Sequence, residues 1–344
     1  MAALAVVGYH LNGSATDYFN SSFLGSSFIH GSLGVDFFFV LSGFIITYVH
    51  FKDIQNRANK TQFLLKRFIR IYPIYWVFCS AFLAILLIVF HGKTEHNHVD
   101  LTSLNDWGII LANYLLITHH EDFYLVVAWT LSFEILFYLV FVLCIRLGLR
   151  GAKIIYFIWA PLVLFKLIFP NWLPDTILFH ERIAEFLIGC FVAYAILKLK
   201  PFPKYLWLSS FIIMLIASII TYPIWLKNPW GTVFLAIING LIIYKFVQID
   251  STKEHKYPKF LMLIGEASYS IYLSHFLFFS ILLRIIKILN TKLNIQGNLT
   301  IQFILIILFG ITVFAGVLVY QLLERPMTKY LTRKFIQKNK FKKV

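Results

Sequence analysis

The residues best suited to chemistry in this chain are ionisable side chains that stand inside long apolar runs. Placing one such group in a bilayer costs about 2.5–3.5 kcal/mol, so each calls for a function or a buried partner. Histidine exchanges protons near neutral pH, and a desolvated carboxylate can do the same. We therefore expect a polar site inside an apolar protein. The set comprises His10, Asp36, Glu134, Arg182, Glu185, His275 and Glu324.

Asp36 stands in the motif Gly-Val-Asp-Phe-Phe-Phe-Val-Leu-Ser-Gly-Phe, residues 34–44. Gly34 and Gly43 in this motif favour the close approach of two helices, and the Ser42 hydroxyl can bond to a neighbouring helix. A carboxylate cannot face lipid. We therefore expect Asp36 to meet a cation, a hydrogen-bond donor or water.

Glu134 closes the motif Trp-Thr-Leu-Ser-Phe-Glu, which begins at Trp129 and contains Ser132. We expect Glu134 about one and a half turns into the membrane, where a desolvated carboxylate suits proton acceptance near neutral pH. Pairing with a buried cation such as Arg182 is the alternative. Arg182 and Glu185 are three residues apart and can also simply neutralise one another.

A cluster of cations precedes the third apolar run. Arg67 and Arg70 are three residues apart and Lys66 and Arg70 are four apart, so on a helix they share a face. Tyr72 and Pro73 follow, and Pro73 suits the first turn of the next span. Three cations on one cytoplasmic face predict a phosphate-binding site, because guanidinium forks match phosphate oxygens. Alternatively, these cations only anchor the next span on the cytoplasmic side of the membrane.

Two histidines lie at opposite ends of the chain. His10 ends the first apolar run, where an ordinary interfacial histidine is the alternative to a functional one. Ser268, Tyr272 and His275 fall at positions i, i+4 and i+7 of a later run. They form one polar stripe on an apolar helix, which must face the protein interior or a cavity.

The remainder of the chain is typical of a protein embedded in lipid. Of its 344 residues 59% are hydrophobic and 14% are charged, against roughly 25% charged in soluble domains. A spanning helix needs about 20 apolar residues, since lipid offers backbone groups no water to bond with. We therefore predict an all-α integral membrane protein, a bundle of about ten transmembrane helices. The expected spans are residues 1–11, 28–50, 72–90, 128–148, 153–169, 182–199, 206–222, 229–249, 266–289 and 300–323.

The distribution of Lys and Arg predicts the orientation. With both termini in the cytoplasm, 24 of the 31 Lys and Arg residues fall on the cytoplasmic side, as the positive-inside rule requires. The short apolar stretch 107–118 is then an interfacial or re-entrant segment, because an eleventh span would break the alternation. We expect one transmembrane domain over residues 1–325, its first helix truncated at the N-terminus, and a basic cytoplasmic tail over 326–344.

Other classes of function fit the sequence less well. The net charge of +15 lies in short loops, which favours membrane orientation over nucleic-acid binding. Cys79, Cys144 and Cys190 lie in apolar runs and are expected in the core, not in disulfides or metal sites. The loop 91–127 holds five histidines whose irregular spacing favours a solvated loop over a metal site. We expect neither a metal nor a bound cofactor.

Taken in order, the motifs resemble the acyltransferase-3 family of membrane proteins, which O-acetylate surface glycans. The chain departs from the family's pattern in one respect. That pattern has an Arg, then ten residues, then the first histidine. Counting back from His10 passes Met1, so this Arg is absent, and we expect either a start further upstream or an impaired copy. The matching pieces are residues 5–10, 34–44, 63–73, 129–134, Arg182 with Phe186 and Gly189, 265–275 and 324–326.

The resemblance implies transfer of an acyl group, most simply acetyl, from cytoplasmic acyl-CoA to a hydroxyl of a cell-surface or lipid-linked carbohydrate. The setting it implies is the plasma membrane of a bacterium. Lys66, Arg67 and Arg70 would bind the phosphates of coenzyme A. His10 would handle the proton or first accept the acyl group, supported by Asp36 or Glu134. The residues expected to line or support the pocket are Ser42, Tyr72, Trp129, Ser132, Arg182, Tyr269, Tyr272 and His275.

Two other functions stay open at this point. A multi-pass proton-coupled transporter would use Asp36, Glu134 and His275 as a relay, although such transporters often contain inverted repeats that are not evident here. A polymerase or flippase for lipid-linked sugars is the third. The expected partners are membrane lipid, acyl-CoA and a carbohydrate acceptor, with no nucleic acid, and the sequence is silent on oligomeric state.

Overall fold

The computed structural model is helical, with no strand among the residues that it describes. The chain divides into two compact units, and each is described by itself. The first unit comprises residues 1–34, 65–132 and 257–344, and the second comprises residues 35–64 and 133–256. The described residues are 1–89, 91–92, 99–117, 123–199, 208–209, 212, 216, 228–252, 257–293 and 297–337.

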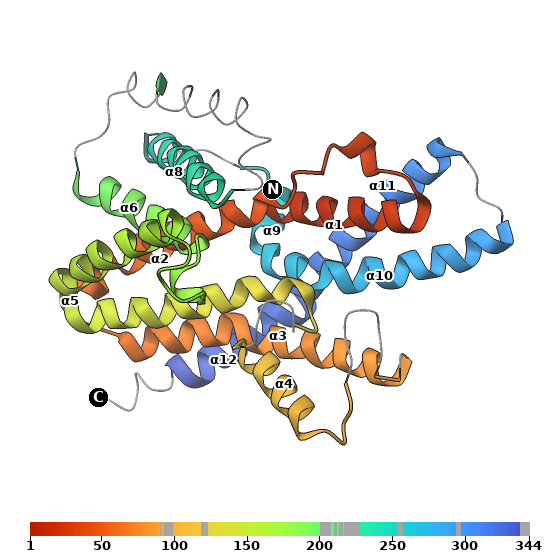
Figure 1. Ribbon diagram of the computed structural model, residues 1–344, viewed down its shortest axis with the longest axis horizontal. Helices are drawn as coiled ribbons and strands as arrows, with labels where there is room; N and C mark the ends of the chain where they lie inside the picture. The colour runs from red at the N-terminus through yellow and green to blue at the C-terminus, as the bar shows by residue number, and fades with distance from the viewer. Residues whose placement is uncertain are drawn as a thin grey trace. The chain divides into compact units, whose positions relative to one another are not determined.

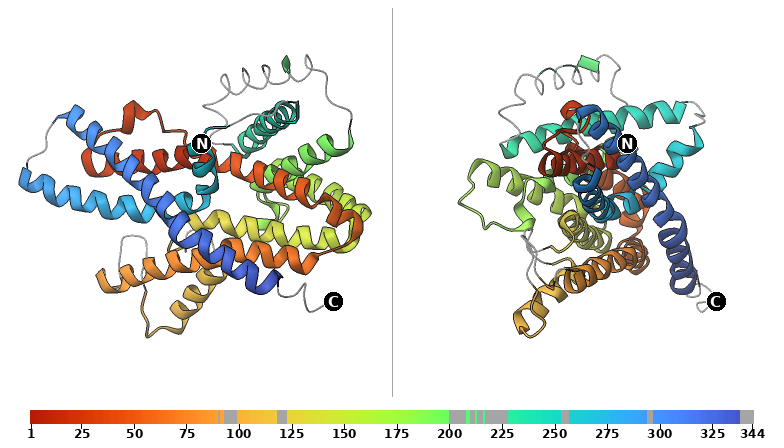
Figure 2. Two further views of the ribbon diagram at one scale, coloured as in Figure 1. Left: turned by 180° about the vertical axis from the view of Figure 1, so that it is seen from behind. Right: turned by 90° about the vertical axis from the view of Figure 1, so that its right-hand side faces the viewer.

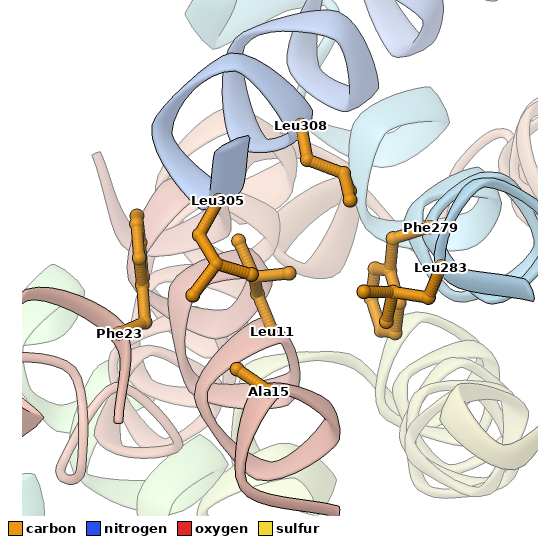
Figure 3. Packing of buried hydrophobic residues seen from close by; sticks show 7 residues of the cluster. All are labelled: Leu11, Ala15, Phe23, Phe279, Leu283, Leu305 and Leu308. Carbon is orange, nitrogen blue, oxygen red and sulfur yellow. The ribbon is translucent and has the colours of Figure 1, made fainter. Parts of the chain in front are cut away.

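The first unit is built on α1 (Ala2–Phe19), which packs along α10 (Ser268–Leu293) and α11 (Asn298–Val319) (Figure 1, Figure 2). Apolar side chains from these helices and from η1 (Phe23–Ser26) form its core (Figure 3). Helix α1 runs beyond the expected end of the first span at residue 11, because its later turns also contribute to this core. The cluster comprises Leu11, Ala15, Phe23, Phe279, Leu283, Leu305 and Leu308.

Most of α3 also belongs to the first unit. This helix, Lys60–Val89, begins a dozen residues before the expected span 72–90, so the cationic cluster is helical. The stretch expected to be interfacial or re-entrant forms α4 (Leu104–Leu115), whose 12 residues are too few to span a membrane. The stretch is therefore a short helix, and its interfacial or re-entrant placement stays a prediction.

The end of the last predicted span differs from the structure. Helix α11 does not stop near residue 323 but continues through the π-helical η5 (Tyr320–Glu324) and α12 (Arg325–Thr332) into η6 (Arg333–Gln337). Pro326 lies in the first turn of α12, where a missing N–H removes no hydrogen bond of that segment. Proline therefore marks a change of helical pitch here and not the end of the helix.

The second unit contains most of α2 (Leu33–Asn56), with α6 (Arg182–Lys198) and α8 (Pro229–Thr252) packed on it. Helices α2 and α6 cross at two glycines. A Cβ at Gly43 would lie 2.2 Å from the Phe186 carbonyl oxygen, and one at Gly189 would lie 2.1 Å from the Val40 carbonyl oxygen. The close approach predicted from Gly43 is confirmed.

Helix α5 (Trp129–Ile168) has two arms that meet at Gly148, whose φ of 74° interrupts the helical geometry (Figure 1). The arms match the expected spans 128–148 and 153–169. A Cβ at Gly148 would strike the Arg57 side chain as well as straining the backbone. Glycine at this position therefore allows the chain to turn between the two arms.

Among the residues that the structure describes, six helical segments are long and apolar enough to cross a membrane. The two arms of α5 count as one of these segments, while α1 and α6 lie outside the set. The expected span 206–222 lies almost wholly outside the described residues. A multi-pass membrane protein is thus supported, and the count of ten spans and the side of each terminus stay predictions. The six segments are residues 33–56, 60–89, 126–168, 230–250, 268–286 and 299–336.

Candidate active site

Two histidines from opposite ends of the chain meet inside the first unit. The His275 Nε2 atom lies 3.0 Å from the His10 Nδ1 atom, and the ring centroids are 5.1 Å apart. His275 is fully buried in α10, whereas His10 in α1 is only partly buried. The packing of α1 along α10 brings the two rings together, and Phe276 meets the His10 ring edge-on.

The contacts of His275 fix which nitrogens carry protons. Its Nδ1 atom lies 2.6 Å from the Tyr272 carbonyl oxygen and 3.2 Å from the Ile271 carbonyl oxygen. Carbonyls only accept, so we infer that Nδ1 donates and that Nε2 of neutral His275 is an acceptor. His10 Nδ1 must then donate to it. The lone pair of His10 is therefore on Nε2.

This arrangement suits a proton acceptor. If His10 takes a proton on Nε2, its bond from Nδ1 to His275 is kept, so no hydrogen bond is lost. A proton on His275 would instead place two N–H groups against each other. The chemistry of the pair is therefore directed to one atom, His10 Nε2, which can act as a base or as a nucleophile.

The other polar groups of α10 tie it to its neighbours. The Tyr272 hydroxyl lies 3.1 Å from the Val127 carbonyl oxygen and 3.0 Å from Thr130 Oγ1. The Tyr269 hydroxyl donates to the Ile71 carbonyl oxygen at 2.9 Å. Of the predicted stripe, Tyr272 and His275 are buried against α1 and η3 (Val126–Ala128), whereas Ser268 is half-buried.

Helix α4 is held by side chains that donate to its last carbonyls. Tyr72 donates to the Leu115 oxygen at 3.1 Å, and Trp76 donates to the Tyr114 oxygen at 2.9 Å. Ser132 donates to the Leu116 oxygen at 2.9 Å. These donors satisfy carbonyls that have no partner within the helix. The hydroxyl protons of Tyr72 and Ser132, both expected in the pocket, are thus used in positioning α4.

The three cations of the predicted phosphate site lie on one stretch of α3, with the predicted helical spacing. Lys66 and Arg70 are exposed and Arg67 is partly buried. Arg70 also acts electrostatically on Glu324, whose carboxylate accepts from Ser270. An exposed face with two cations is suited to phosphate binding.

In the second unit, Arg182 lies between two carboxylates. Its Nη1 atom is 3.2 Å from Asp36 Oδ1 and 3.5 Å from Glu185 Oε1. Asp36 and Glu185 are both buried. The expectation that Asp36 meets a cation is confirmed, and the pairing of Arg182 with Glu185 is found as well.

Glu134 has different partners. Its Oε1 atom accepts from Ser42 Oγ at 3.4 Å and from the Tyr138 hydroxyl. The alternative pairing of Glu134 with Arg182 is not found, because the arginine is engaged by the other two carboxylates. Tyr138 was missed by the sequence interpretation, although its place four residues after Glu134 on one helix face is a usable signal.

The site residues are thus distributed over both units. His10 and His275 belong to the first unit, and Asp36, Glu134 and Arg182 to the second. Trp129, at the start of α5, is partly buried in the first unit. Support of His10 by Asp36 or Glu134 stays a prediction. Within the described ranges no three His, Cys, Asp or Glu side chains gather as metal ligands, and four of the loop histidines lie outside those ranges.

Comparison with known proteins identifies the class. A family model described as an acyltransferase domain matches residues 1–320, so the chain belongs to this acyltransferase family. It is 26% identical over 314 residues to peptidoglycan O-acetyltransferase OatA of Listeria monocytogenes serovar 1/2a, covering 80% of this chain and 47% of that protein. It is 30% identical over 156 residues to acyltransferase MdmB of Streptomyces mycarofaciens, covering 42% of this chain and 37% of that protein.

The chain therefore spans less than half the length of these two curated relatives. No solved structure matches it significantly. Membership of the family confirms the resemblance seen in the motifs and does not favour the transporter alternative.

Proposed function

We propose that this protein is a membrane O-acyltransferase that transfers an acyl group, most simply acetyl, from acyl-CoA to a carbohydrate hydroxyl. The observation that carries the proposal is the histidine pair, which leaves a lone pair on His10 Nε2 in a protein of the acyltransferase family. The acceptor class follows from the relatives, one of which is named a peptidoglycan O-acetyltransferase.

In the proposed reaction His10 Nε2 takes the proton of the acceptor hydroxyl. At the same time the hydroxyl oxygen attacks the thioester carbonyl carbon. The carbon–sulfur bond breaks, and the thiolate leaves and takes the proton from His10, which gives free coenzyme A and an ester. A positioned base of this kind contributes about 10²–10⁴-fold to the rate. Alternatively Nε2 attacks the thioester first and expels the thiolate of coenzyme A. The acceptor hydroxyl then takes the acyl group from the acyl-imidazole, and its proton passes to the thiolate.

The donor would be bound from the cytoplasm. Lys66, Arg67 and Arg70 carry the charge and the forked geometry that coenzyme A phosphates require. We expect this end of α3 in the cytoplasm, because the positive-inside count favours a protein with about ten spans and both ends inside. A bacterial plasma membrane is the proposed setting. No bound cofactor is needed for this chemistry.

The test uses membranes that contain the full chain, radiolabelled acetyl-CoA and the host's surface glycan. We expect label in glycan with the unaltered protein and a loss of at least about 100-fold with His10→Ala. His30→Ala is the matched control, since His30 is an exposed histidine of the same unit. Equal labelling by His10→Ala would remove His10 from the mechanism.

The two routes can be separated with the same material. Without acceptor, the route through acyl-imidazole predicts label on the protein that His10→Ala abolishes, and direct transfer predicts none. If neither protein nor glycan is labelled in a host that acetylates its surface sugars, the acyltransferase proposal fails. The result would favour the proton-coupled transporter.

A further inference from the structure

The second unit contains an apolar cavity of about 320 Å³ between α2, both arms of α5 and α6. This volume is at the lower end of the range for ligand sites, about 300–1,000 Å³. It is about twice that of an engineered 150 Å³ cavity that stays dry and binds benzene. The cavity is therefore large enough for an apolar ligand.

Water is a poor occupant of this cavity. The lining is almost wholly hydrocarbon and aromatic, with side chains such as Phe137, Phe141 and Leu187. A buried water needs two to four polar partners. One of the few polar groups present, the Thr47 hydroxyl, already donates to Cys190 Sγ at 3.2 Å. The lining thus suits a hydrocarbon chain.

Two lysines lie beside one pair of rings in the lining. The Lys153 ammonium is 5.4 Å from the centroid of Tyr194, and the Lys198 ammonium is 5.3 Å from the centroid of Phe51. The two rings are 6.3 Å apart, and both line the cavity, as does Lys153 itself. Neither lysine forms a salt bridge with any residue that the structure describes.

An anionic amphiphile fits a site of this kind. Its hydrocarbon chain matches the apolar lining, and its negative headgroup matches the two lysine ammonium groups at the edge. We propose that the cavity binds one acyl chain of an anionic membrane phospholipid, whose phosphate lies between Lys153 and Lys198. A zwitterionic lipid offers the same chain without the net charge. The site is distinct from the histidine pair, and the proposal does not rest on the acyl-transfer reaction.

The test is native mass spectrometry of the full chain, purified in detergent and titrated with phosphatidylglycerol or phosphatidylcholine. We expect one tightly bound phosphatidylglycerol and weaker binding of phosphatidylcholine. Each lysine near an anionic headgroup contributes about 1 kcal/mol, so Lys153→Ala with Lys198→Ala should weaken phosphatidylglycerol about 30-fold.

A matched control is present in the chain. Lys334 stacks on Tyr330 and Phe335 at 5.7 and 5.4 Å but lines no part of this cavity. Lys334→Ala should leave phosphatidylglycerol binding unchanged. If it weakens binding as much as the double substitution does, binding follows total charge and the proposed site is wrong.

A second variant tests the chain-binding part of the cavity without altering charge. Ala152 lies in the lining, and Ala152→Phe should fill part of the space and exclude the lipid. Thermal unfolding of the variant checks that the fold is kept. Retention of the lipid by a folded Ala152→Phe protein would overturn the proposal. Displacement of phosphatidylglycerol by stoichiometric acetyl- or palmitoyl-CoA would also overturn it, because the cavity would then belong to the donor.

Discussion

His275 is predicted to act through His10 and not on the substrate itself. It is fully buried, its Nδ1 is engaged by carbonyls, and its Nε2 accepts from His10 at 3.0 Å. Replacing His275 with Leu removes this acceptor and leaves the Val6 carbonyl as the hydrogen-bond partner of the His10 ring. When His10 is protonated, a hydrogen bond to the charged ring contributes about 1.5–3 kcal/mol. If that energy holds His10 in its competent tautomer and orientation, kcat should fall about 10- to 100-fold.

The assay is initial-rate acyl transfer with labelled acetyl-CoA over a range of donor concentrations. The KM for the donor should change little, because the cations of α3 are untouched. His275→Gln should recover most of the lost rate, since its amide oxygen can accept from His10 at a similar position. Combining His275→Leu with His10→Ala should be no slower than His10→Ala alone, because residues that act as a unit are not additive.

Two results would refute this reasoning. If the rate losses of the two single variants multiply in the double variant, His275 contributes independently of His10. If His275→Gln is as slow as His275→Leu while both are folded in the membrane, the hydrogen bond is not what matters. Thermal unfolding in detergent provides the measure of folding for each variant.

Three further variants test the packing and the charges. Arg182→Met should lower the free energy of unfolding by about 3–5 kcal/mol, because it leaves two buried carboxylates without their cation; urea unfolding in detergent measures this. Gly43→Leu should cost at least about 1–3 kcal/mol by the same assay, since a Cβ there would lie 2.2 Å from a carbonyl oxygen. Arg67→Gln with Arg70→Gln should raise the donor KM at low salt and have less effect at high salt, measured by transfer kinetics.

The controls are a glycine in another helix, for Gly43→Leu, and the partners of Arg182, for Arg182→Met. Gly310→Ala in α11 should be neutral or slightly stabilising, because nothing lies within 4 Å of its Cβ position. Adding Asp36→Asn and Glu185→Gln to Arg182→Met should restore part of its stability. An Arg182→Met protein as stable as the unaltered chain would show that the carboxylates are not charged in the fold.

The sequence predicted much of the helical framework, because hydrophobic runs and glycines act locally. Both arms of α5, the short α4 and the close approach at Gly43 were expected. The ends of helices were harder to predict. Helix α1 extends past residue 11 because Ala15 packs into a core made by α10 and α11, which a local pattern does not contain. The last span was expected to end at residue 323, whereas the helix continues through a π-helical segment into α12, which contains Pro326.

The sequence predicted that each buried ionisable group needs a partner. It did not predict which residue that partner is. The cost of a charge in lipid says that Asp36 and Glu134 must be satisfied. It does not say that Asp36 takes Arg182, 146 residues away, while Glu134 takes a neighbour on its own helix, Tyr138.

The histidine pair shows most clearly why a partner matters. His10 and His275 are 265 residues apart, and each alone reads as an ordinary buried or interfacial histidine. An imidazole without a hydrogen-bond partner has no fixed tautomer and no preferred nitrogen. Two carbonyls of α10 orient His275, His275 orients His10, and the lone pair is thereby assigned to one atom. The reactive group is therefore a property of two packed helices, which no motif in either helix could specify by itself.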